Sequence, residues 1–471
     1  MIPVTEYAGR DVAVFGLGRT GLSAARALVA GGARVHAWDD DPAIRAKAEA
    51  AGLVLSDINK RDWQGFEALV LSPGVPFRFP QPHRLVRMAN AMDVPVIGDM
   101  ELFARAVQAL PSRGRPKVIG VTGTNGKSTT TALIGHILDQ AGIDARVGGN
   151  IGTGVLDMAP LHANAVYVLE LSSYQLDLVK SLHCDVAVFL NLSPDHLERH
   201  GGIDGYLAAK KRIFRSQDTG DTAVIGFDDV YSQAAALEMK RGAAKVWTVS
   251  SEFALGCGVS VVGGRLFDSL SGKAVGVGDL SGAPALRGRH NHQNAAAAYA
   301  ACRALGVDTK TILAGIESFP GLPHRLETVA VRDGVTFIND SKATNAQAAE
   351  QALRAFDRVH WIAGGRAKSD GIAALEPCLN RVAKAYLIGE AEAAFAATLQ
   401  DKVPIHRSRT LTAAVAAAFA DARASGQADP VVLLSPACAS FDQFPDFEAR
   451  GEAFRDAVNA LPINAPEVET A

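Results

Sequence analysis

A glycine-rich segment between an apolar strand pattern and a helix pattern constrains this chain more than any other feature. Residues 120–129 read Gly-Val-Thr-Gly-Thr-Asn-Gly-Lys-Ser-Thr, with a strand expected over 117–121 and a helix over 129–141. Glycines at 120, 123 and 126 let backbone N–H groups close on phosphate oxygens, the lysine adds a mobile charge, and the serine can hold Mg²⁺. The strict motif has Gly where this chain has Val121, so the first glycine comes one place early. The segment predicts a nucleotide-binding loop.

A second glycine-rich turn lies near the N-terminus. A strand pattern over 11–15 leads into Gly16-Leu-Gly-Arg-Thr-Gly21, a helix is expected over 22–30, and Asp39 follows the next strand pattern. This arrangement is typical of dinucleotide binding, but the diphosphate of a UDP-sugar suits the same helix N-terminus. From this motif alone, NAD, a UDP-sugar and a turn without a ligand all remain open.

Length and composition limit the class of protein. The 471 residues exceed one ordinary core, and the formal net charge of −3 argues against nucleic acid or an anionic membrane as the main partner. Because the sequence shows no signal-peptide pattern and no apolar run of about 18 residues, we expect a cytoplasmic protein without membrane insertion. The odd number of cysteines, without C-x-x-C spacing, predicts neither a disulfide framework nor a zinc site. We expect all of them in the core: Cys184, Cys257, Cys302, Cys378 and Cys438.

Strand and helix patterns alternate along most of the chain, which predicts an α/β protein with largely parallel sheets. Proline and glycine interrupt both periodicities over 110–116 and 319–324. Cutting there gives three predicted domains: a Rossmann-like domain over 1–111, a central P-loop-type ATPase domain over 112–321, and a second Rossmann-like domain over 322–471. The central domain should carry a small β-rich excursion over about 245–288. Further strands are expected near 34–38, 68–72, 165–171, 185–192, 358–363 and 431–435.

Three residues of the middle third could hold or position a metal. Glu170 ends an apolar strand pattern, so we expect it either to bind Mg²⁺ or to form a buried ion pair. His196 lies in the loop after the next strand and either completes a second metal site or is a surface residue. Lys210 shares a helical stripe with apolar residues, and burial would favour a neutral amine that CO₂ can convert into a carbamate. The alternative for Lys210 is an ammonium group that reaches water.

The last third repeats a strand followed by a polar loop three times, at 339–345, 364–369 and 435–442. Loops at the carboxyl ends of parallel strands share one edge of a sheet, where open α/β sheets bind ligands. Lysine, arginine and hydroxyl groups there would suit an anionic small molecule, although merely solvated loops are the alternative. These groups belong to Ser341, Lys342, Thr344, Arg366, Lys368, Ser435 and Ser440.

Taken together, these motifs resemble the ATP-dependent Mur ligase superfamily over nearly the whole chain. The resemblance implies an ATP-dependent amide ligase of peptidoglycan precursor synthesis that forms an acyl phosphate, uses ATP and Mg²⁺, and acts on small molecules as a monomer. The N-terminal turn, Ser72-Pro-Gly74 and the loops 339–345 and 434–444 are similar to the branch that adds D-glutamate to UDP-N-acetylmuramoyl-L-alanine. The other motifs are Gly123-Thr-Asn-Gly-Lys-Ser-Thr129, Gly149-Asn-Ile-Gly152, Glu170-Leu-Ser-Ser-Tyr-Gln175, Asp195-His196, Ala209-Lys210, His290-Asn-His-Gln-Asn294 and Pro323-His-Arg-Leu-Glu327.

The resemblance also implies roles for single residues, with Lys127, His196 and Lys210 as the catalytic group. The UDP-substrate would contact Arg19, Thr20, Asp39, Gly74, Asn150, Gln175 and His196. ATP would contact Gly123, Thr124, Asn125, Gly126, Lys127, Ser128, Thr129, Asn294, Arg325 and Asp340. Mg²⁺ would be held by Ser128, Glu170, His196 and a carbamylated Lys210, and D-glutamate by Thr344, Lys368, Ser440, Phe441 and Phe447.

The chain departs from the family pattern at two places. Asp40 and Asp41 stand where relatives often have a hydroxyl and a basic residue, and Gly365-Arg-Ala367 replaces a common Gly-Asp-Gly. Two functions of other classes are also considered: an NAD-dependent dehydrogenase that uses the first turn, and a nucleotide-driven switch. The dehydrogenase leaves Lys127 unexplained, and the switch would not need the donor-rich loops of the last third.

Overall fold

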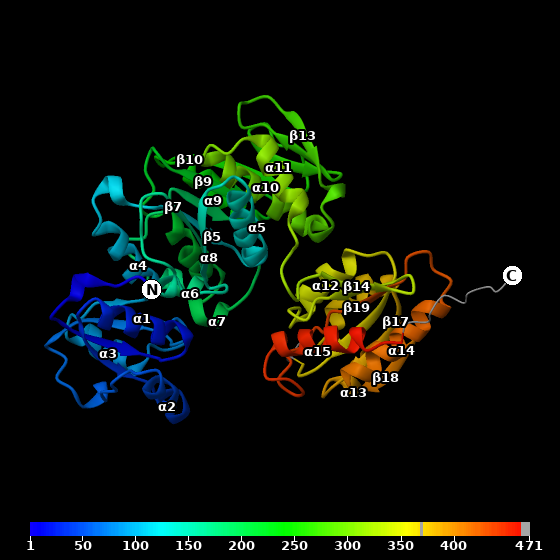
Figure 1. The fold of residues 1–471 in the computed structure, drawn as a ribbon, viewed down its shortest axis with the longest axis horizontal. Helices are drawn as coiled ribbons and strands as arrows, with labels where there is room; N and C mark the ends of the chain where they lie inside the picture. Colours follow the sequence, from blue (N-terminus) through cyan, green and yellow to red (C-terminus); the bar gives the residue numbers. More distant parts are fainter. Residues whose placement is uncertain (368–370, 463–471) are drawn as a thin grey trace. The chain divides into compact units, whose positions relative to one another are not determined.

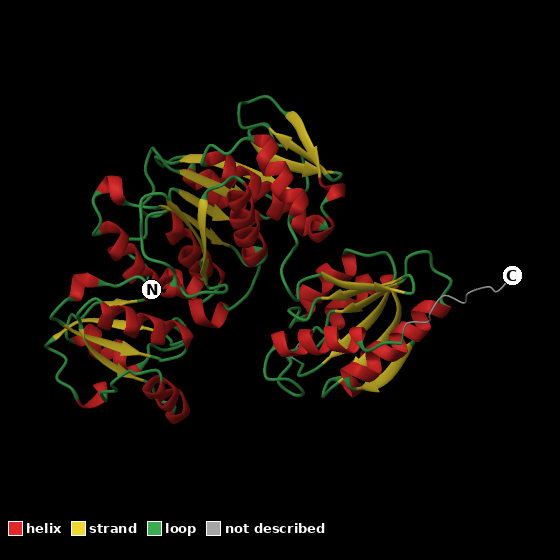
Figure 2. Ribbon diagram, in the orientation of Figure 1, coloured by secondary structure: helices red, strands yellow, loops and turns green. Residues whose placement is uncertain are grey.

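The computed structural model describes residues 1–367 and 371–462, and the predicted α/β class is confirmed (Figures 1 and 2). The first sheet has four strands in the order β2-β1-β3-β4, and every neighbouring pair is parallel. Its strands are β1 (Asp11–Phe15), β2 (Arg34–Trp38), β3 (Phe66–Leu71) and β4 (Val96–Ile97). The helices of this part are α1 (Arg19–Ala30), α2 (Pro42–Ala50), α3 (Arg84–Ala91) and α4 (Asp99–Gln108).

The second sheet has nine strands in the order β13-β12-β11-β10-β9-β8-β5-β7-β6. The seven strands β5 to β11 pair in parallel with their neighbours. The predicted β-rich excursion extends the same sheet with the antiparallel strands β12 and β13. Because β5 lies between β7 and β8, the loop that follows β5 has polar strand ends on both sides. The strands are β5 (Lys117–Thr122), β6 (Asp144–Gly149), β7 (Ala165–Glu170), β8 (Val186–Phe189), β9 (Thr222–Gly226), β10 (Lys245–Ser250), β11 (Gly258–Val262), β12 (Arg265–Asp268) and β13 (Val275–Asp279).

Helices that follow these strands begin close to the predicted positions. The helix after the glycine-rich loop starts at Lys127, two residues early, and the helix that carries Lys210 ends at Lys211 and continues as a 3₁₀ turn. The helices are α5 (Lys127–Gln140), α6 (Ser173–Asp177), α7 (Leu197–His200), α8 (Ile203–Lys211), α9 (Val230–Met239), α10 (Arg289–Ala304) and α11 (Thr309–Ser318).

The third sheet has the order β14-β15-β19-β16-β17-β18, and only its edge strand β14 is antiparallel among the described residues. Successive residues alternate between two cores: Trp361 packs with α12 and α13, whereas Ile362 packs with α14 and α15. The elements are β14 (Glu327–Arg332), β15 (Val335–Asn339), α12 (Ala346–Arg354), β16 (Val359–Gly364), β17 (Val382–Ile388), α13 (Glu392–Leu399), β18 (Ile405–Arg409), α14 (Leu411–Ala424), β19 (Val431–Leu434) and α15 (Phe447–Asn459).

Internal contacts divide the chain into two compact units. One unit contains residues 1–282 and 291–318 and carries the first two sheets, and the other contains 283–290 and 319–471 and carries the third. Each sheet falls inside one of the three predicted domains, although the boundaries at 111/112 and 321/322 stay predictions. One core assignment is wrong, because Cys257 is exposed while the other four cysteines are buried. Cys257 lies in the connection between β10 and β11.

Two glycines of the N-terminal turn should differ sharply on substitution. A Cβ on Gly21 would lie 1.7 Å from the carbonyl oxygen of Gly16, whereas a Cβ on Gly18 would meet no atom within 4 Å. We therefore expect Gly21→Ala to lower the free energy of unfolding by about 1–3 kcal/mol, the usual cost of forcing extra atoms into a packed site. Gly18→Ala is the matched control and should leave stability nearly unchanged. Urea unfolding measures both, and equal effects would contradict the close packing of this turn.

Candidate active site

The glycine-rich loop after β5 is fixed to the loop after β8. The backbone N–H groups of Thr124 and Asn125 donate to the backbone and side-chain oxygens of Asn191, at 2.9 Å each. At the end of the loop, Gly126 has a positive φ of 85°, and a Cβ there would lie 2.1 Å from Oδ1 of Asn294. Only glycine fits this close approach, which brings the buried Asn294 of α10 against the N-terminus of α5. Gly120, in contrast, lies inside β5 and not in the loop. A Cβ there would lie 2.8 Å from Sγ of Cys184, so close packing explains this glycine.

Two lysines converge on the carbonyl oxygen of Gly123. Nζ of Lys127 lies 3.1 Å from this oxygen and 2.8 Å from the carbonyl oxygen of Thr124. Nζ of Lys210, from α8, donates to the same Gly123 oxygen at 2.7 Å. Lys127 is therefore half-buried against its own loop. Its ammonium group is held against the backbone of the glycine-rich loop.

Lys210 is buried as deeply as a core residue, with 1% of its surface exposed. Its ammonium group lies 4.6 Å from the centre of the Tyr206 ring. Burial, reinforced by the nearby charge of Lys127, holds the pKa of Lys210 well below its usual value. The interpretation of Lys210 as a lysine that reaches water is therefore wrong, and burial favours its neutral amine.

Glu170 brings a carboxylate to the same place from the end of β7. Its Oε1 accepts a hydrogen bond from Nδ2 of Asn150 at 2.7 Å, whereas its buried Oε2 has no partner among the described residues. An unpartnered carboxylate oxygen is costly to bury, and a divalent cation would satisfy it. Ser128 is also buried at the start of α5. These oxygen donors fit Mg²⁺, which prefers oxygen ligands.

His196 is half-exposed and has a positive φ of 51°, which fixes the direction of its side chain at the start of α7. Its Nε2 lies 3.4 Å from a carboxylate oxygen of Asp195. Partial burial lowers the pKa of His196, and the charges of Lys127 and Lys210 act in the same direction. A neutral imidazole in this position can bind a metal or a substrate.

In the N-terminal turn, both carboxylate oxygens of Asp39 accept hydrogen bonds from backbone groups. Its two oxygens accept from the N–H groups of Leu17 and Asp41, at 2.7 and 2.9 Å. The side chain of Arg19, the first residue of α1, donates to the carbonyl oxygens of Gly152 and Asn150, at 3.0 and 3.3 Å. The turn is thereby linked to the loop that follows β6. Thr20 is half-buried in the first turn of α1.

The two unusual aspartates beside Asp39 have structural partners. Asp40 forms an ion pair of 2.8 Å with Arg84, and the side chain of Asp41 caps α2 by accepting from the N–H of Ala43. Both side chains therefore help to fix the segment between β2 and α2. At these two positions, aspartates therefore fill structural roles in place of the hydroxyl and basic residues that relatives often have.

Sequence reasoning missed Arg199 and Asp99. Arg199 donates to the carbonyl oxygen of Gly74 at 3.0 Å and lies 4.6 Å from the centre of the Tyr174 ring, beside a small pocket. Asp99 is buried at the start of α4, accepts from Nε2 of Gln175 at 3.2 Å, and has a pKa raised by burial to about 6. Gln175 itself completes a capping box with Ser172. Arg199 follows Asp195-His196 closely in sequence, which is the only signal that could have found it.

The C-terminal unit holds a second group of polar strand ends. Asp340, just after β15, accepts from Oγ of Ser435 at 2.8 Å and from the N–H of Leu326 at 3.3 Å. Burial raises the pKa of Asp340 to about 7, against the opposing charges of Arg325 and Arg450. Arg325 stands between two residues of positive φ, His324 and Leu326. This strained turn fixes the direction in which Arg325 leaves the backbone.

The predicted amino-acid site is only partly brought together. Nζ of Lys342 lies 3.6 Å from the centre of the Phe447 ring, at the start of α15. Ser440 is buried, Thr344 is half-buried, and Phe441 is 62% exposed. Lys368 lies outside the described residues.

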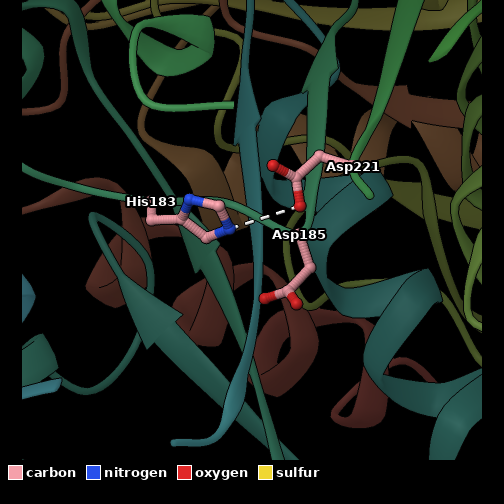
Figure 3. A group of neighbouring side chains, drawn as sticks. All are labelled: His183, Asp185 and Asp221. Carbon is pink, nitrogen blue, oxygen red and sulfur yellow. Dashed lines mark ion pairs between the residues drawn. The ribbon is translucent and has the colours of Figure 1, made fainter. Parts of the chain in front are cut away.

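Another group of possible metal ligands occurs at the opposite ends of the central strands (Figure 3). His183, Asp185 and Asp221 precede β8 and β9. Nδ1 and Nε2 of His183 lie 2.8 Å from the Ser216 carbonyl oxygen and 3.2 Å from Asp221, while Asp185 accepts from the N–H of Val118 at 2.8 Å. Since protein groups already satisfy these atoms, the cluster ties strand starts together and is separate from the phosphate loop.

Comparison with known proteins identifies the family. Residues 10–98 match the Mur ligase MurD-like N-terminal domain, residues 121–302 the Mur ligase middle domain, and residues 324–438 the Mur ligase glutamate ligase domain. The chain is 57% identical to a UDP-N-acetylmuramoylalanine–D-glutamate ligase of Caulobacter vibrioides, with 98% of each chain covered. The chain belongs to the Mur ligase family. A ligase of the same description from Rhodospirillum rubrum is 51% identical, over 98% of this chain and 97% of that protein.

Solved Mur ligases share the fold at low sequence identity. The UDP-N-acetylmuramate-alanine ligase of Thermotoga maritima matches with a TM-score of 0.57 at 16% identity, over 96% of this chain and 99% of that one. The MurF ligase of the same organism, solved in complex with ADP, also matches with a TM-score of 0.57, at 18% identity over 98% and 97% of the two chains. These likenesses confirm a Mur ligase fold. No helix in the described parts of the chain is both long and apolar enough to cross a membrane.

The second departure from the Mur ligase pattern also has a clear local structure. Arg366, in Gly365-Arg-Ala367, exchanges backbone hydrogen bonds of 2.9 and 3.1 Å with Ala439. Its guanidinium pairs with Glu390 through two contacts of 3.2 Å. The loops after β16, β17 and β19 are therefore fixed together without the aspartate that is common in the family.

The raised pKa of Asp340 predicts that replacing its carboxylate by a neutral side chain stabilises the folded protein, by an amount that depends on pH. Because the ionised form is disfavoured in the folded state, the wild type loses stability as pH rises from the ordinary carboxyl value of 3.8 through about 7. Asp340→Asn should therefore be more stable than the wild type above pH 7, by up to a few kcal/mol at about 1.4 kcal/mol per pKa unit. This gain should shrink toward pH 4.

Hydrogen exchange of peptides from β15 and β19, followed at pH 5 and pH 8.5, measures this effect. The fully exposed Asp357 provides the matched control, and Asp357→Asn should show no comparable pH dependence. If wild type and Asp340→Asn differed in stability by the same amount at both pH values, ionisation of Asp340 would not destabilise the folded protein, and the prediction would be wrong.

Proposed function

We propose that this Mur ligase uses ATP to join D-glutamate to the alanyl carboxylate of UDP-N-acetylmuramoyl-L-alanine. The observation that carries the proposal is the convergence of Lys127 and Lys210 on one carbonyl oxygen of the glycine-rich loop, with the unsatisfied carboxylate of Glu170 near enough to act on the charge of Lys210. The chain that carries this arrangement is 57% identical to a ligase named for this reaction. The reaction belongs to peptidoglycan precursor synthesis. We also propose that the protein acts as a monomer in the cytoplasm.

The N-terminal turn would hold the UDP diphosphate at the start of α1. Arg19 and Thr20 stand in the first turn of this helix, where backbone N–H groups and the helix dipole favour an anion. Asp39 would act by shaping the turn, since backbone groups already occupy both of its oxygens. Gly74 would contact the ligand through a loop that Arg199 holds in place. Asn150, Gln175 and His196 would line the path from this turn toward the phosphate loop.

The phosphate loop would hold ATP, with Asn294 packed against its last glycine. Gly123, Thr124, Asn125 and Gly126 offer backbone groups, Lys127 would leave its two carbonyl partners for the transferring phosphate, and Ser128 and Thr129 begin the helix. From the family resemblance alone, Arg325 and Asp340, which belong to the other unit, are also proposed as ATP-binding residues. Mg²⁺, bound by Ser128, Glu170, His196 and a carbamylated Lys210, would neutralise phosphate charge.

The chemistry has two steps. The alanyl carboxylate attacks the γ-phosphorus of ATP, which forms an acyl phosphate and releases ADP. The amine of D-glutamate then attacks the acyl carbon, loses a proton, and displaces phosphate to leave the amide. Binding of all reactants in fixed positions supplies much of the rate, because the reacting atoms are held near attack distance. Thr344, Lys368, Ser440, Phe441 and Phe447 would receive the amino acid.

Release of phosphate tests the function directly. The purified protein is incubated with ATP, Mg²⁺, UDP-N-acetylmuramoyl-L-alanine and a panel of D- and L-amino acids. We expect strong preference for D-glutamate, because alanine lacks the second carboxylate and would leave donors of the site unpaired. Equal use of D-alanine or L-lysine would indicate a different Mur ligase. Tight binding of NADH without binding of the UDP-substrate, measured by calorimetry, would show that the N-terminal turn serves a dehydrogenase.

Lys210 should be essential as a carbamate anion. Its amine adds to CO₂ and releases one proton, and the product supplies a negative group beside Glu170. Lys210→Ala should fold but lose activity by a factor of roughly 10² to 10³, a typical loss for one stabilising group. Acetate should partly restore turnover by occupying the vacated space. Lys211→Ala is the control, because Lys211 lies at the surface of the same helix and pairs with Glu238. Absence of rescue, together with an ordinary lysine mass at position 210 in active enzyme, would exclude the carbamate.

A further inference from the structure

Arg450 is a charged side chain enclosed inside the C-terminal unit. It belongs to α15, and only 1% of its surface is exposed. Arginine is rarely buried to this extent, because removing a guanidinium from water is costly unless its N–H groups are well paired. The position is therefore expensive to maintain. An apolar side chain of similar volume would fill the same space at lower cost.

The guanidinium joins two of the three polar loops at the sheet edge. Nε donates to Oγ of Ser341 at 2.9 Å, and Nη2 donates to the carbonyl oxygens of Ser341 and Cys438 at 2.8 and 3.1 Å. Oγ of Ser341 in turn donates to the carbonyl oxygen of Phe447 at 2.8 Å. The loops after β15 and β19 and the start of α15 are thus held by one planar group.

The remaining nitrogen points toward the third loop. Nη1 is buried and has no partner among the described residues. A Cβ on Gly365 would lie 3.2 Å from this nitrogen and 2.4 Å from the carbonyl oxygen of Ala439, so the loop after β16 approaches here without room for a side chain. Burial lowers the pKa of Arg450 only to about 10, which leaves the group charged at neutral pH. A fixed positive charge therefore lies beneath all three loops.

We propose that Arg450 is a positioning residue for the incoming amino acid, because it sets the loops that would bind a dicarboxylate and adds a buried positive charge behind them. The inference rests on the proposed function and deepens it. Arg450 does not contact the amino acid itself. It acts through Ser341, which stands beside Lys342, and through Cys438, which stands two residues before Ser440. A neutral or differently shaped side chain would let these loops shift, and the amino acid would lose binding more than ATP would.

Steady-state kinetics with each substrate varied in turn tests this role. Arg450→Lys keeps the charge but cannot make the three hydrogen bonds with one planar group, and Arg450→Met removes the charge. We expect both variants to raise KM for D-glutamate by roughly 10- to 100-fold, the usual range for residues that orient a binding group. KM for UDP-N-acetylmuramoyl-L-alanine should stay near that of the wild type. Arg455→Lys is the matched control, since Arg455 lies on the same helix and pairs at the surface with Glu327 and Glu452.

Ser341→Ala keeps the test decisive if the Arg450 variants fold poorly. It removes one of the three hydrogen bonds, so KM for D-glutamate should rise in the same direction by a smaller factor. Unchanged KM for D-glutamate in the folded variants, or an equal rise for all three substrates, would overturn the positioning role. Failure of the wild type itself to use D-glutamate would instead overturn the proposed function.

Discussion

The carbonyl oxygen of Gly123 is the shared acceptor on which the geometry of the candidate ATP site depends. It receives Lys127 from the start of α5 and Lys210 from α8, so two cations lie close together in a buried place. Their mutual repulsion adds to desolvation and disfavours the charged form of Lys210. The same arrangement holds Lys127 against its own loop, and in the proposed ATP site its ammonium group would leave these carbonyl oxygens for the phosphates. One backbone carbonyl thus links the position of the first lysine with the protonation of the second.

Buried carboxylates recur at the ends of strands and the starts of helices in both units of the chain. Glu170 and Asp99 each have an oxygen without a partner among the described residues, and Asp340 carries a raised pKa. Such groups lower stability, because the surrounding cores remove water without supplying full compensation. The apolar cores of the sheets offset the folding free energy that these buried carboxylates cost.

The two glycine-rich turns show how similar motifs use glycine differently. In the N-terminal turn, Gly21 allows α1 to pack directly on the carbonyl of Gly16, and Gly18 faces open space. In the phosphate loop, Gly126 adopts a positive φ and admits the side chain of Asn294. The first turn is therefore built around a strand-to-helix contact. The second is built around a contact between distant segments, which local sequence does not reveal.

The sequence by itself determined the α/β class, the strand runs and the phosphate loop, because apolar periodicity and glycine spacing are local properties. It also singled out Glu170 and Lys210, since a carboxylate in an apolar strand and a lysine on an apolar stripe violate the usual pattern. Tertiary structure alone decided that Lys127 and Lys210 share one acceptor, that each Asp39 oxygen accepts from a backbone group, and that Cys257 is exposed. It also revealed the contacts of Arg199 with Gly74, of Asp99 with Gln175 and of Arg450 with Ser341, which join residues far apart in sequence. Burial and hydrogen bonding depend on which segments the fold brings together, and a local pattern carries no record of those distant neighbours.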